Sequence, residues 1–420
     1  MAAPTKIARQ PWMEEPPTRA LLAALGEAGI VARFVGGCVR DALIGRPIAD
    51  IDLATPSRPQ AVMAALRKAA IKAVPTGIEH GTVTAVVHSV GSLRHYEITT
   101  LRRDVETDGR RARVAFDADW HEDAERRDFT INALYLDPDG TLHDPVGGLA
   151  DLEAHRVRFV GDPATRIAED RLRVLRYYRF EARFGGDGGG DAGDGDTAAR
   201  AACRAAAPEL WQLSPERVAG ELFRLLAVPD PLRALRMMTA DGVLAAILPE
   251  ATRLDRLARV IRLEPQPDPL RRLMALLDVD GDRAAVVAAR LRLSNAERDR
   301  LVGLAAPWPI DAAADERAQR LALYRLGAER YRDLMLLATA EPRATPAQLA
   351  AALDLLASWR PPRFPLAGRD VLALGIPPGV RVGELLAAVR AWWEDDDFSA
   401  GRAACLQRLR QIAEASDAAV

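Results

Sequence analysis

The periodicity of the apolar residues changes once along the chain, and this change limits the folds that are possible. Up to about Gly148, short β-like runs alternate with turns and two helical stretches, which is typical of a mixed α/β domain. From Pro163 onward, apolar residues recur at i, i+3, i+4 and i+7, which predicts helices and loops only. We therefore expect an α+β N-terminal domain, a mixed β-sheet with helices, followed by an all-α remainder. The strand-like runs are residues 31–35, 49–55, 82–88, 94–101 and 112–116.

Charge and cysteine content narrow the classes of protein. The 57 Lys and Arg residues nearly balance the 59 Asp and Glu residues, so binding to a polyanion would need a local basic surface. The three cysteines lie far apart, which argues against a zinc knuckle or a disulfide framework and favours a reducing compartment. No run of 18 apolar residues could cross a bilayer, and the N-terminus lacks the apolar segment of a signal peptide. These features predict a soluble, cytoplasmic protein without membrane contact.

The densest chemical signal lies in residues 34–55, FVGGCVRDALIGRPIADIDLAT. A predicted strand ends in Gly36-Gly37 and a helix begins at once. Glycine allows the backbone to approach a ligand closely, and N–H groups at a helix start favour an anion such as phosphate. Arg40, one helical turn later, could bind the same anion.

Two aspartates follow this turn. Asp50 and Asp52 are two positions apart in a strand-like run, so both carboxylates should point to the same face. Mg²⁺ prefers such a pair of carboxylates together with phosphate oxygens and water. Either feature alone would be an ordinary turn or a solvated strand end, but together they describe a site for a metal-bound nucleoside triphosphate.

Joined at this spacing, the block resembles the signature of the polymerase-β nucleotidyltransferase superfamily. Further motifs resemble the class II tRNA nucleotidyltransferase and bacterial poly(A) polymerase family over about residues 20–227. A weaker match at residues 365–386 is similar to the tail of the CCA-adding members. The matching motifs are HGTV (80–83), EITTLRRD (97–104), RRDFTINAL (126–134), HDPVGGLADL (143–152) and AEDRLRVLRYYRF (168–180).

The resemblance implies roles for residues of the N-terminal domain. Gly37 and Arg40 would bind the nucleotide. Glu97 would be the third carboxylate of a polymerase-like site and act on the primer hydroxyl. The stretch with Arg127, Asp128 and Asn132 would contact the ribose and phosphate of the nucleotide, and a carboxylate that accepts from a 2′-OH would help to choose a ribonucleotide.

Arginine is concentrated beyond this point, because residues 102–183 contain fifteen Arg and no Lys. Such a bias suits fixed, planar contacts with phosphates and base edges. Within a predicted helix at 168–180, Asp170 and Arg173 are i, i+3 and should share a face, and the same spacing continues. The later members of this row are Arg176 and Arg179.

A salt-bridged helix surface could show the same spacing. In this family, however, Asp170 would accept from an exocyclic amino group while Arg173 donates to the neighbouring ring nitrogen. Cytosine and adenine share that pattern, so the pair would select CTP and ATP without a template. Arg176 and Arg179 would hold the triphosphate and the far side of the site.

The resemblance also predicts a four-part chain and its activity. We expect a nucleotidyltransferase head at 18–150, a helical neck for base recognition at 151–228, and an RNA-binding body and tail at 229–350 and 351–420. The activity would be template-independent addition of C, C and A to the 3′ end of tRNA with release of pyrophosphate, with Mg²⁺ as cofactor and no protein partner. A poly(A) polymerase, an enzyme that adds only CC or only A, and a non-catalytic RNA-binding protein are the alternatives. The presence of all the polar site residues together weakens the last one.

Further expectations concern individual segments. Thr18 is predicted to cap a helix over residues 18–30, and Ser214 to cap a helix that ends near residue 226. The tract GGDGGGDAGDGD, residues 185–196, has nothing to bury and should be a mobile loop between helices. Residues 102–114 are highly charged and resemble the flexible loop with which CCA-adding members switch from C to A. Trp392-Trp393 is expected in a core.

Overall fold

The computed structural model describes residues 5–48, 50–89, 92–108, 111–186, 195–305 and 307–417. The chain divides into two compact units, Met1–Ala251 and Thr252–Val420. The N-terminal unit contains a mixed sheet and helices, and the described part of the C-terminal unit is helical, which confirms the predicted fold class. The boundary at Ala251 falls within the predicted body, and the four-part division stays a prediction.

An eight-stranded sheet forms the centre of the N-terminal unit, in the order β1-β10-β9-β2-β3-β6-β5-β4. β3 and β6 are parallel, and the other neighbours are antiparallel. A separate two-stranded ribbon pairs β7 with β8. The strands are β1 (Thr5–Lys6), β2 (Arg33–Val35), β3 (Ile51–Thr55), β4 (Lys72–Gly77), β5 (Thr82–Ser89), β6 (Ser92–Thr100), β7 (Arg103–Asp108), β8 (Arg111–Ala115), β9 (Tyr135–Leu136) and β10 (Thr141–His143).

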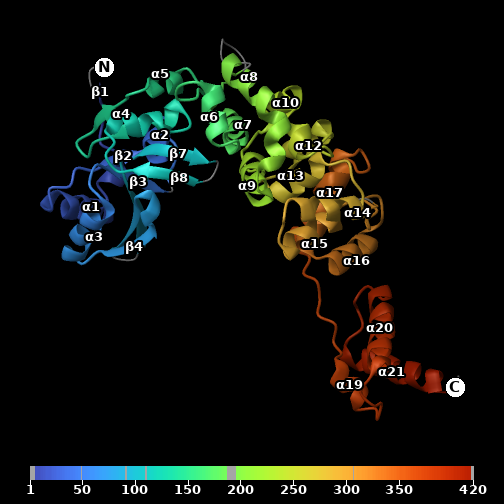
Figure 1. The fold of residues 1–420 in the computed structure, drawn as a ribbon. Helices are drawn as coiled ribbons and strands as arrows, with labels where there is room; N and C mark the ends of the chain where they lie inside the picture. The colour runs from blue at the N-terminus through green and yellow to red at the C-terminus, as the bar shows by residue number, and fades with distance from the viewer. Residues whose placement is uncertain are drawn as a thin grey trace. The chain divides into compact units, whose positions relative to one another are not determined.

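One face of the sheet is covered by α1 (Pro16–Glu27) and α3 (Pro59–Lys68), which lie together against β5 (Figure 1). On β6, Tyr96 and Ile98 are buried, whereas Glu97 between them is exposed. Since side chains alternate along a strand, Glu97 points to the face opposite the one that carries Tyr96 and Ile98. The Tyr96 hydroxyl lies 2.9 Å from the hydroxyl of Thr18 in α1, which identifies the covered face.

The prediction that Thr18 is the N-cap of this helix is wrong. The helix begins two residues earlier, at Pro16, and Pro at the first helical position is favoured because its φ is already helical. Thr18 is instead fully buried, and its hydroxyl donates to the Trp12 carbonyl at 2.9 Å. The threonine thus joins the helix to the sheet.

Nine further α-helices complete the described part of the N-terminal unit. α7 is held by aromatic packing: the Phe180 and Tyr177 rings lie 4.8 and 6.4 Å from the ring of Phe129. Ser214 is the N-cap residue of α9, as predicted. The helices are α2 (Gly37–Leu43), α4 (Trp120–Glu125), α5 (Gly148–Glu153), α6 (Pro163–Glu169), α7 (Leu172–Phe184), α8 (Thr197–Ala206), α9 (Pro215–Leu226), α10 (Leu232–Ala240) and, as a single further turn, α11 (Val243–Ile247).

The single helix predicted over residues 168–180 is interrupted. α6 ends at Glu169, and Asp170 is extended, with φ −154° and ψ 106°. The Asp170 carboxylate accepts from the Leu172 N–H at 3.1 Å, and its carbonyl accepts from the Arg173 N–H at 3.0 Å. A short polar side chain that binds the backbone in this way competes with helix continuation, so Asp170 separates α6 from α7.

The C-terminal unit contains two apolar clusters, one around Tyr331 and one around Trp393. Trp393 is buried and Trp392 packs against the same cluster, as expected. No described helix is long and apolar enough to cross a membrane. The helices are α12 (Leu254–Leu263), α13 (Pro269–Leu276), α14 (Gly281–Arg290), α15 (Asn295–Leu304), α16 (Glu316–Leu326), α17 (Ala328–Ala340), α18 (Pro346–Ser358), α19 (Gly368–Leu372), α20 (Val380–Asp395) and α21 (Arg402–Asp417).

Two predictions fall partly outside the described residues. Most of the Gly/Asp tract, residues 187–194, is among the parts not described, although its two described ends do lie between α7 and α8. Residues 109 and 110 of the predicted switch loop are also not described. The remainder of that segment forms β7 and β8, which confirms the strand expected near residues 112–116.

Candidate active site

Three carboxylates gather where β3 and β6 run side by side. Asp52 on β3 pairs in register with Glu97 on β6, and Asp50 directly precedes β3. Register partners on neighbouring strands point to the same face, so Glu97 lies beside Asp52 on the face not covered by α1. Burial raises the pKa of Asp52 to about 6, Glu97 and Asp50 add to this effect, and Arg127 opposes it. The three acids therefore form a site that favours a cation.

The donor set fits a hard divalent cation. Among the described residues, no group of three or more His, Cys, Asp or Glu side chains is arranged to hold a metal ion. A site of two carboxylates completed by phosphate oxygens and water needs no such group, and this is the usual arrangement for Mg²⁺. The pKa of Asp52 is raised first by burial and then by repulsion from Glu97 and Asp50, and a bound cation would favour its ionised form.

The glycine turn lies next to these acids. Gly36 has a φ of +72°, which favours glycine, and a Cβ there would lie 3.6 Å from Arg127 Nη1 and 3.7 Å from the Asn132 carbonyl oxygen. Gly37 is the first residue of α2, with its Cβ position 3.7 Å from Arg40 Nη2. The turn thus brings the backbone close to three of the predicted nucleotide-binding residues.

Arg40 is buried beneath this turn. Its guanidinium donates to Asp41 at 2.9 Å and to the side-chain oxygen of Asn132, and it lies 4.1 Å over the ring of Phe184. Burial lowers the pKa of Arg40 below its usual range, although Asp41 opposes this effect. A buried cation of this kind would gain from a nearby anion.

Arg127 is held by an acid that sequence analysis missed. Asp123, which is 1% exposed, accepts from Arg127 Nη2 at 2.9 Å and from the Tyr135 hydroxyl at 2.8 Å. Burial acts to raise the pKa of Asp123, but Arg127 and Arg126 lower it to about 2. The i, i+4 spacing of Asp123 and Arg127 was a signal that could have identified this pair.

Asp128 connects the sheet to α7. Its carboxylate accepts from Asn132 Nδ2 at 3.0 Å and from Arg176 Nε at 2.8 Å. Burial opposes ionisation, but Arg176 and Asn132 lower the pKa of Asp128 to about 2. Arg176 is thereby fixed toward the sheet, on the same network as Arg40 and Arg127.

Asp170 lies between α6 and α7, whereas Arg173 lies in the first turn of α7, so they do not share a helix face as predicted. Asp170 accepts from Arg217 Nη2 at 2.6 Å, whereas Arg173 donates to the Arg166 carbonyl at 2.6 Å and to the Glu169 carboxylate. The difference arises because Asp170 is extended rather than helical. Each side chain has a positioning partner that the spacing did not reveal.

Glu221 of α9 is a further missed residue. It is 2% exposed, and it accepts from Arg179 Nε at 2.5 Å and from Arg224 Nη1 at 2.8 Å. Arg176 Nη1 lies 3.8 Å from the same carboxylate. One buried acid therefore orients three arginines along this side of the site, and it leaves positive charge available to an anion.

The arrangement suits a metal-bound polyphosphate. The acids at β3 and β6 face Arg127, and hydrogen bonds continue through Asn132 to Arg40 and through Asp128 to Arg176. Carboxylates that hold a divalent cation beside several arginines can position the phosphates of a nucleotide for attack by a hydroxyl. All the predicted site residues belong to the N-terminal unit.

Two family models match the chain. The model described as "Poly A polymerase head domain" covers residues 32–158, which include the acids at β3 and β6. The model described as "Probable RNA and SrmB- binding site of polymerase A" covers residues 196–254.

Individual proteins match over longer stretches. The mitochondrial CCA tRNA nucleotidyltransferase 1 of Mus musculus is 34% identical over 379 residues, 87% of this chain and 83% of that protein. A CCA-adding enzyme of Streptococcus gordonii is 41% identical over 226 residues, 53% of each chain. The crystal structure of the Bacillus stearothermophilus CCA-adding enzyme in complex with CTP matches with a TM-score of 0.77 and 28% sequence identity. The matched region covers 97% of this chain and 100% of that chain.

Proposed function

The chain belongs to the family of class II CCA-adding tRNA nucleotidyltransferases, and we propose that it adds C, C and A to the 3′ end of tRNA. CTP and ATP are the nucleotide substrates, and each addition releases pyrophosphate. The observation that carries the proposal is that Asp52 pairs in register with Glu97. Asp50 and Arg127 both interact electrostatically with Asp52. These carboxylates would supply the cation site and the proton acceptor that nucleotidyl transfer requires.

Enzymes of this family typically use a divalent metal, and the proposed ion here is Mg²⁺, held by Asp50 and Asp52. When bound, the ion supplies activation of the primer hydroxyl and stabilisation of the leaving pyrophosphate. Glu97 accepts the proton of the 3′-hydroxyl. The 3′-oxygen then forms its bond to the α-phosphorus while the bond from the α-phosphorus to the bridging oxygen breaks, and the pyrophosphate carries away that electron pair.

The arginines hold the substrate during this exchange. Arg40, Arg176 and Arg179 contact the triphosphate, and the acids Asp41, Asp128 and Glu221 keep their guanidinium groups in place. Arg127, Asp128 and Asn132 contact the ribose and phosphate, next to the turn at Gly37. Because these arginines are already fixed by hydrogen bonds, little side-chain entropy is lost when the nucleotide binds.

Base selection is assigned to Asp170 and Arg173. Arg217 keeps the Asp170 carboxylate as an acceptor, and Glu169 orients Arg173 as a donor. Cytosine and adenine offer the complementary amino group and ring nitrogen, whereas uracil and guanine offer the opposite pattern. The two side chains therefore discriminate among nucleotides in place of a template.

The remaining helices bind tRNA, through the proposed neck at 151–228, body at 229–350 and tail at 351–420. Recognition there would depend on the phosphates and shape of the acceptor arm. We also propose that the protein acts in the cytoplasm. Its three cysteines are free and buried, which suits a reducing compartment.

The proposal is tested by replacing one acid. Asp52→Asn should lower the rate of CMP and AMP transfer to a tRNA that lacks its CCA end by several orders of magnitude, because the cation site loses a charged ligand. Affinity for tRNA, measured by filter binding, should stay within about twofold.

Asp139→Asn is the matched control, since Asp139 is an exposed acid paired with Lys6 at 3.4 Å on the edge of the same sheet. This variant should transfer nucleotides at the wild-type rate. An Asp52→Asn protein as active as the Asp139→Asn protein would contradict the proposed role of the acids.

A further inference from the structure

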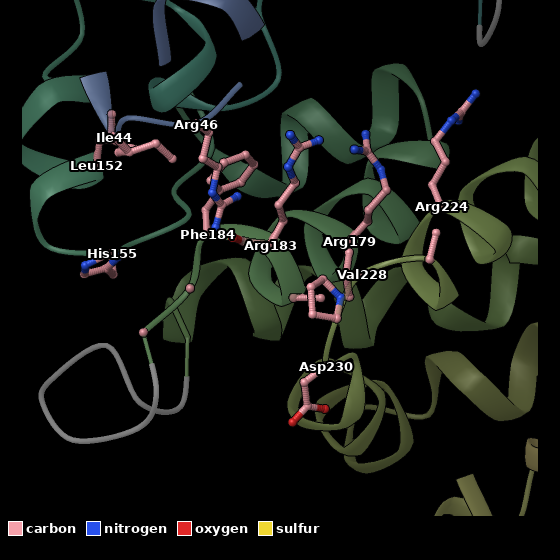
Figure 2. Close-up of a pocket in the computed structure, with 15 residues that line it drawn as sticks. Ile44, Arg46, Leu152, His155, Arg179, Arg183, Phe184, Arg224, Val228 and Asp230 are labelled. Carbon is pink, nitrogen blue, oxygen red and sulfur yellow. Dashed lines mark hydrogen bonds between the residues drawn. The ribbon is translucent and has the colours of Figure 1, made fainter. Parts of the chain in front are cut away.

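A cavity of about 950 Å³ lies in the N-terminal unit at the C-terminal end of α7 (Figure 2). Its walls come from the segment after α2, the end of α5, the end of α7 and the segment after α9. Figure 2 shows Arg179, Arg183 and Arg224 extending their guanidinium groups to one side of the helices, while Asp230 lies apart from them. Arg46 completes the set of arginines in the lining.

The cavity is rich in positive charge. Four arginines line it, against one lining carboxylate, Asp230. Two further acids, Asp41 and Glu221, contact arginines of the lining. They do not neutralise its positive charge, because each also lies close to an arginine outside the cavity. Asp41 accepts from Arg183 at 3.1 Å and also from Arg40. Glu221 binds Arg179 and Arg224 and lies 3.8 Å from Arg176.

The cavity adjoins the residues proposed to hold the triphosphate. Arg179 belongs to both, and the ring of Phe184 in the cavity wall lies 4.1 Å from the Arg40 guanidinium. The same ring lies 5.0 Å from the guanidinium of Arg46 and 5.2 Å from that of Arg183. A continuous row of arginines therefore leads from the nucleotide site into the cavity.

The position of these arginines relative to the proposed base-recognition residues indicates which ligand the cavity binds. The attacking oxygen and the leaving pyrophosphate lie on opposite sides of the α-phosphorus, roughly in line. Base recognition is assigned to Asp170, before the first turn of α7, and Arg40 meets α7 at its last turn, near Phe184. The cavity lies at this last turn, at the end of α7 remote from Asp170, where the proposed contacts with Arg40 and Arg179 would hold the phosphates furthest from the base.

We propose that this cavity is a second oxyanion site, distinct from the β- and γ-phosphate positions, that takes pyrophosphate as it leaves the nucleotide site. The inference rests on the proposed function for the source of the pyrophosphate. Arginine suits this ligand because its planar fork binds phosphate oxygens in pairs. Pyrophosphate held there no longer occupies the positions that the next CTP or ATP needs.

The test is calorimetric titration of pyrophosphate with Mg²⁺ into the full chain, first free and then saturated with CTP, in the absence of tRNA. Pyrophosphate should still bind the CTP-saturated protein. Arg183→Gln and Arg46→Gln should each weaken that binding by about tenfold, as expected for loss of a charged hydrogen bond. Arg183→Lys should fall between these variants and the wild type.

Arg236→Gln is the matched control, since Arg236 is an exposed arginine of α10 outside the cavity lining, and it should bind pyrophosphate as the wild type does. Thermal unfolding of each variant shows whether the fold is retained, and Arg46→Gln gives an independent result if Arg183→Gln disturbs Asp41.

Three outcomes would overturn the inference. Saturation with CTP could abolish pyrophosphate binding, which would mean that pyrophosphate binds only at the nucleotide site. Binding could be the same in the Arg46 and Arg183 variants as in the Arg236 control. The variants could instead lose tenfold in tRNA affinity with unchanged pyrophosphate binding, which would assign the cavity to RNA phosphates. A wild-type protein that fails to extend tRNA would contradict the proposed function alone, because the titration involves no nucleotide addition.

Discussion

Asp52 differs from the other acids of the site in the charges that surround it. Asp123 and Asp128 each bind an arginine directly, and the pKa of each lies near 2 in spite of burial. Asp52 has Glu97 and Asp50 as neighbours, and burial together with these two acids raises its pKa to about 6. The protein therefore maintains an unfavourable cluster of negative charge at one point, as expected where a cation binds.

This cluster should cost stability when no metal is present. Asp52→Asn removes one charge without changing the size of the side chain, so in EDTA the variant should be more stable than the wild type by roughly 1–3 kcal/mol at about pH 8. The folded wild type holds its Asp52 proton up to about pH 6, whereas the unfolded chain loses it near 3.8. The difference in free energy of unfolding should therefore shrink as the pH falls through 6 and vanish below about 4.

Denaturant titrations of both proteins across this pH range measure the effect. A variant that is less stable than the wild type at about pH 8 would show that the negative charges around Asp52 do not destabilise the folded protein. Asp139→Asn serves as the control, because Asp139 is exposed and pairs with Lys6 rather than with other acids.

Arg173 should determine selectivity as well as rate. Arg173→Ala leaves the amino-group acceptor Asp170 in place but removes the donor, which costs roughly 1–3 kcal/mol per unmatched polar group. Discrimination of CTP and ATP against UTP and GTP should fall together with kcat/KM. Arg171→Ala is the matched control, because Arg171 is next to Asp170 but binds Glu209 at 2.7 Å. Retained selectivity in Arg173→Ala would contradict the assignment of base recognition to this pair.

Local sequence patterns predicted the helices and strands better than they predicted which distant residues contact one another. The strand-like runs led to β3 and β6, and the Gly-Gly turn led to α2, because periodicity and turn chemistry are properties of neighbouring residues. The register of Asp52 with Glu97 joins strands that are far apart in the sequence, and only the family resemblance suggested it. Glu221 was missed for the same reason.

The break between α6 and α7 was also not predictable from the apolar pattern. That pattern continues past Asp170, while the interruption results from hydrogen bonds of its carboxylate and carbonyl to the following N–H groups. Thr18 was misassigned because a Ser or Thr before an apolar run usually caps a helix, and here Pro16 starts the helix earlier.

The ribbon of β7 and β8 is predicted to control the change from C to A. It forms its own sheet, separate from the eight-stranded sheet, so it can shift without breaking that sheet's hydrogen bonds. Shortening residues 105–110 should give products that stop after CC, as seen by high-resolution electrophoresis. Removal of residues 188–193 from the Gly/Asp tract is the matched control and should leave all three additions intact. Complete CCA ends from the protein shortened at 105–110 would contradict this role.

The two compact units differ in the proposed site residues that they contain. The N-terminal unit contains all the proposed catalytic and nucleotide-binding residues. The C-terminal unit encloses charged groups that pair with one another: Arg271 binds Glu264 and Asp333 at 2.5 and 2.8 Å, and all three side chains are buried. Each of these charged side chains therefore has a partner inside the unit.

The most direct test of CCA addition is sequencing of the 3′ ends that the protein makes on a tRNA that lacks CCA, with all four nucleoside triphosphates present. The full chain should add C, C and A and then stop, because the proposed base-selecting pair, Asp170 and Arg173, accepts only cytosine and adenine. Long A tails, products that end after CC, or incorporation of U or G would contradict the proposed addition of C, C and A.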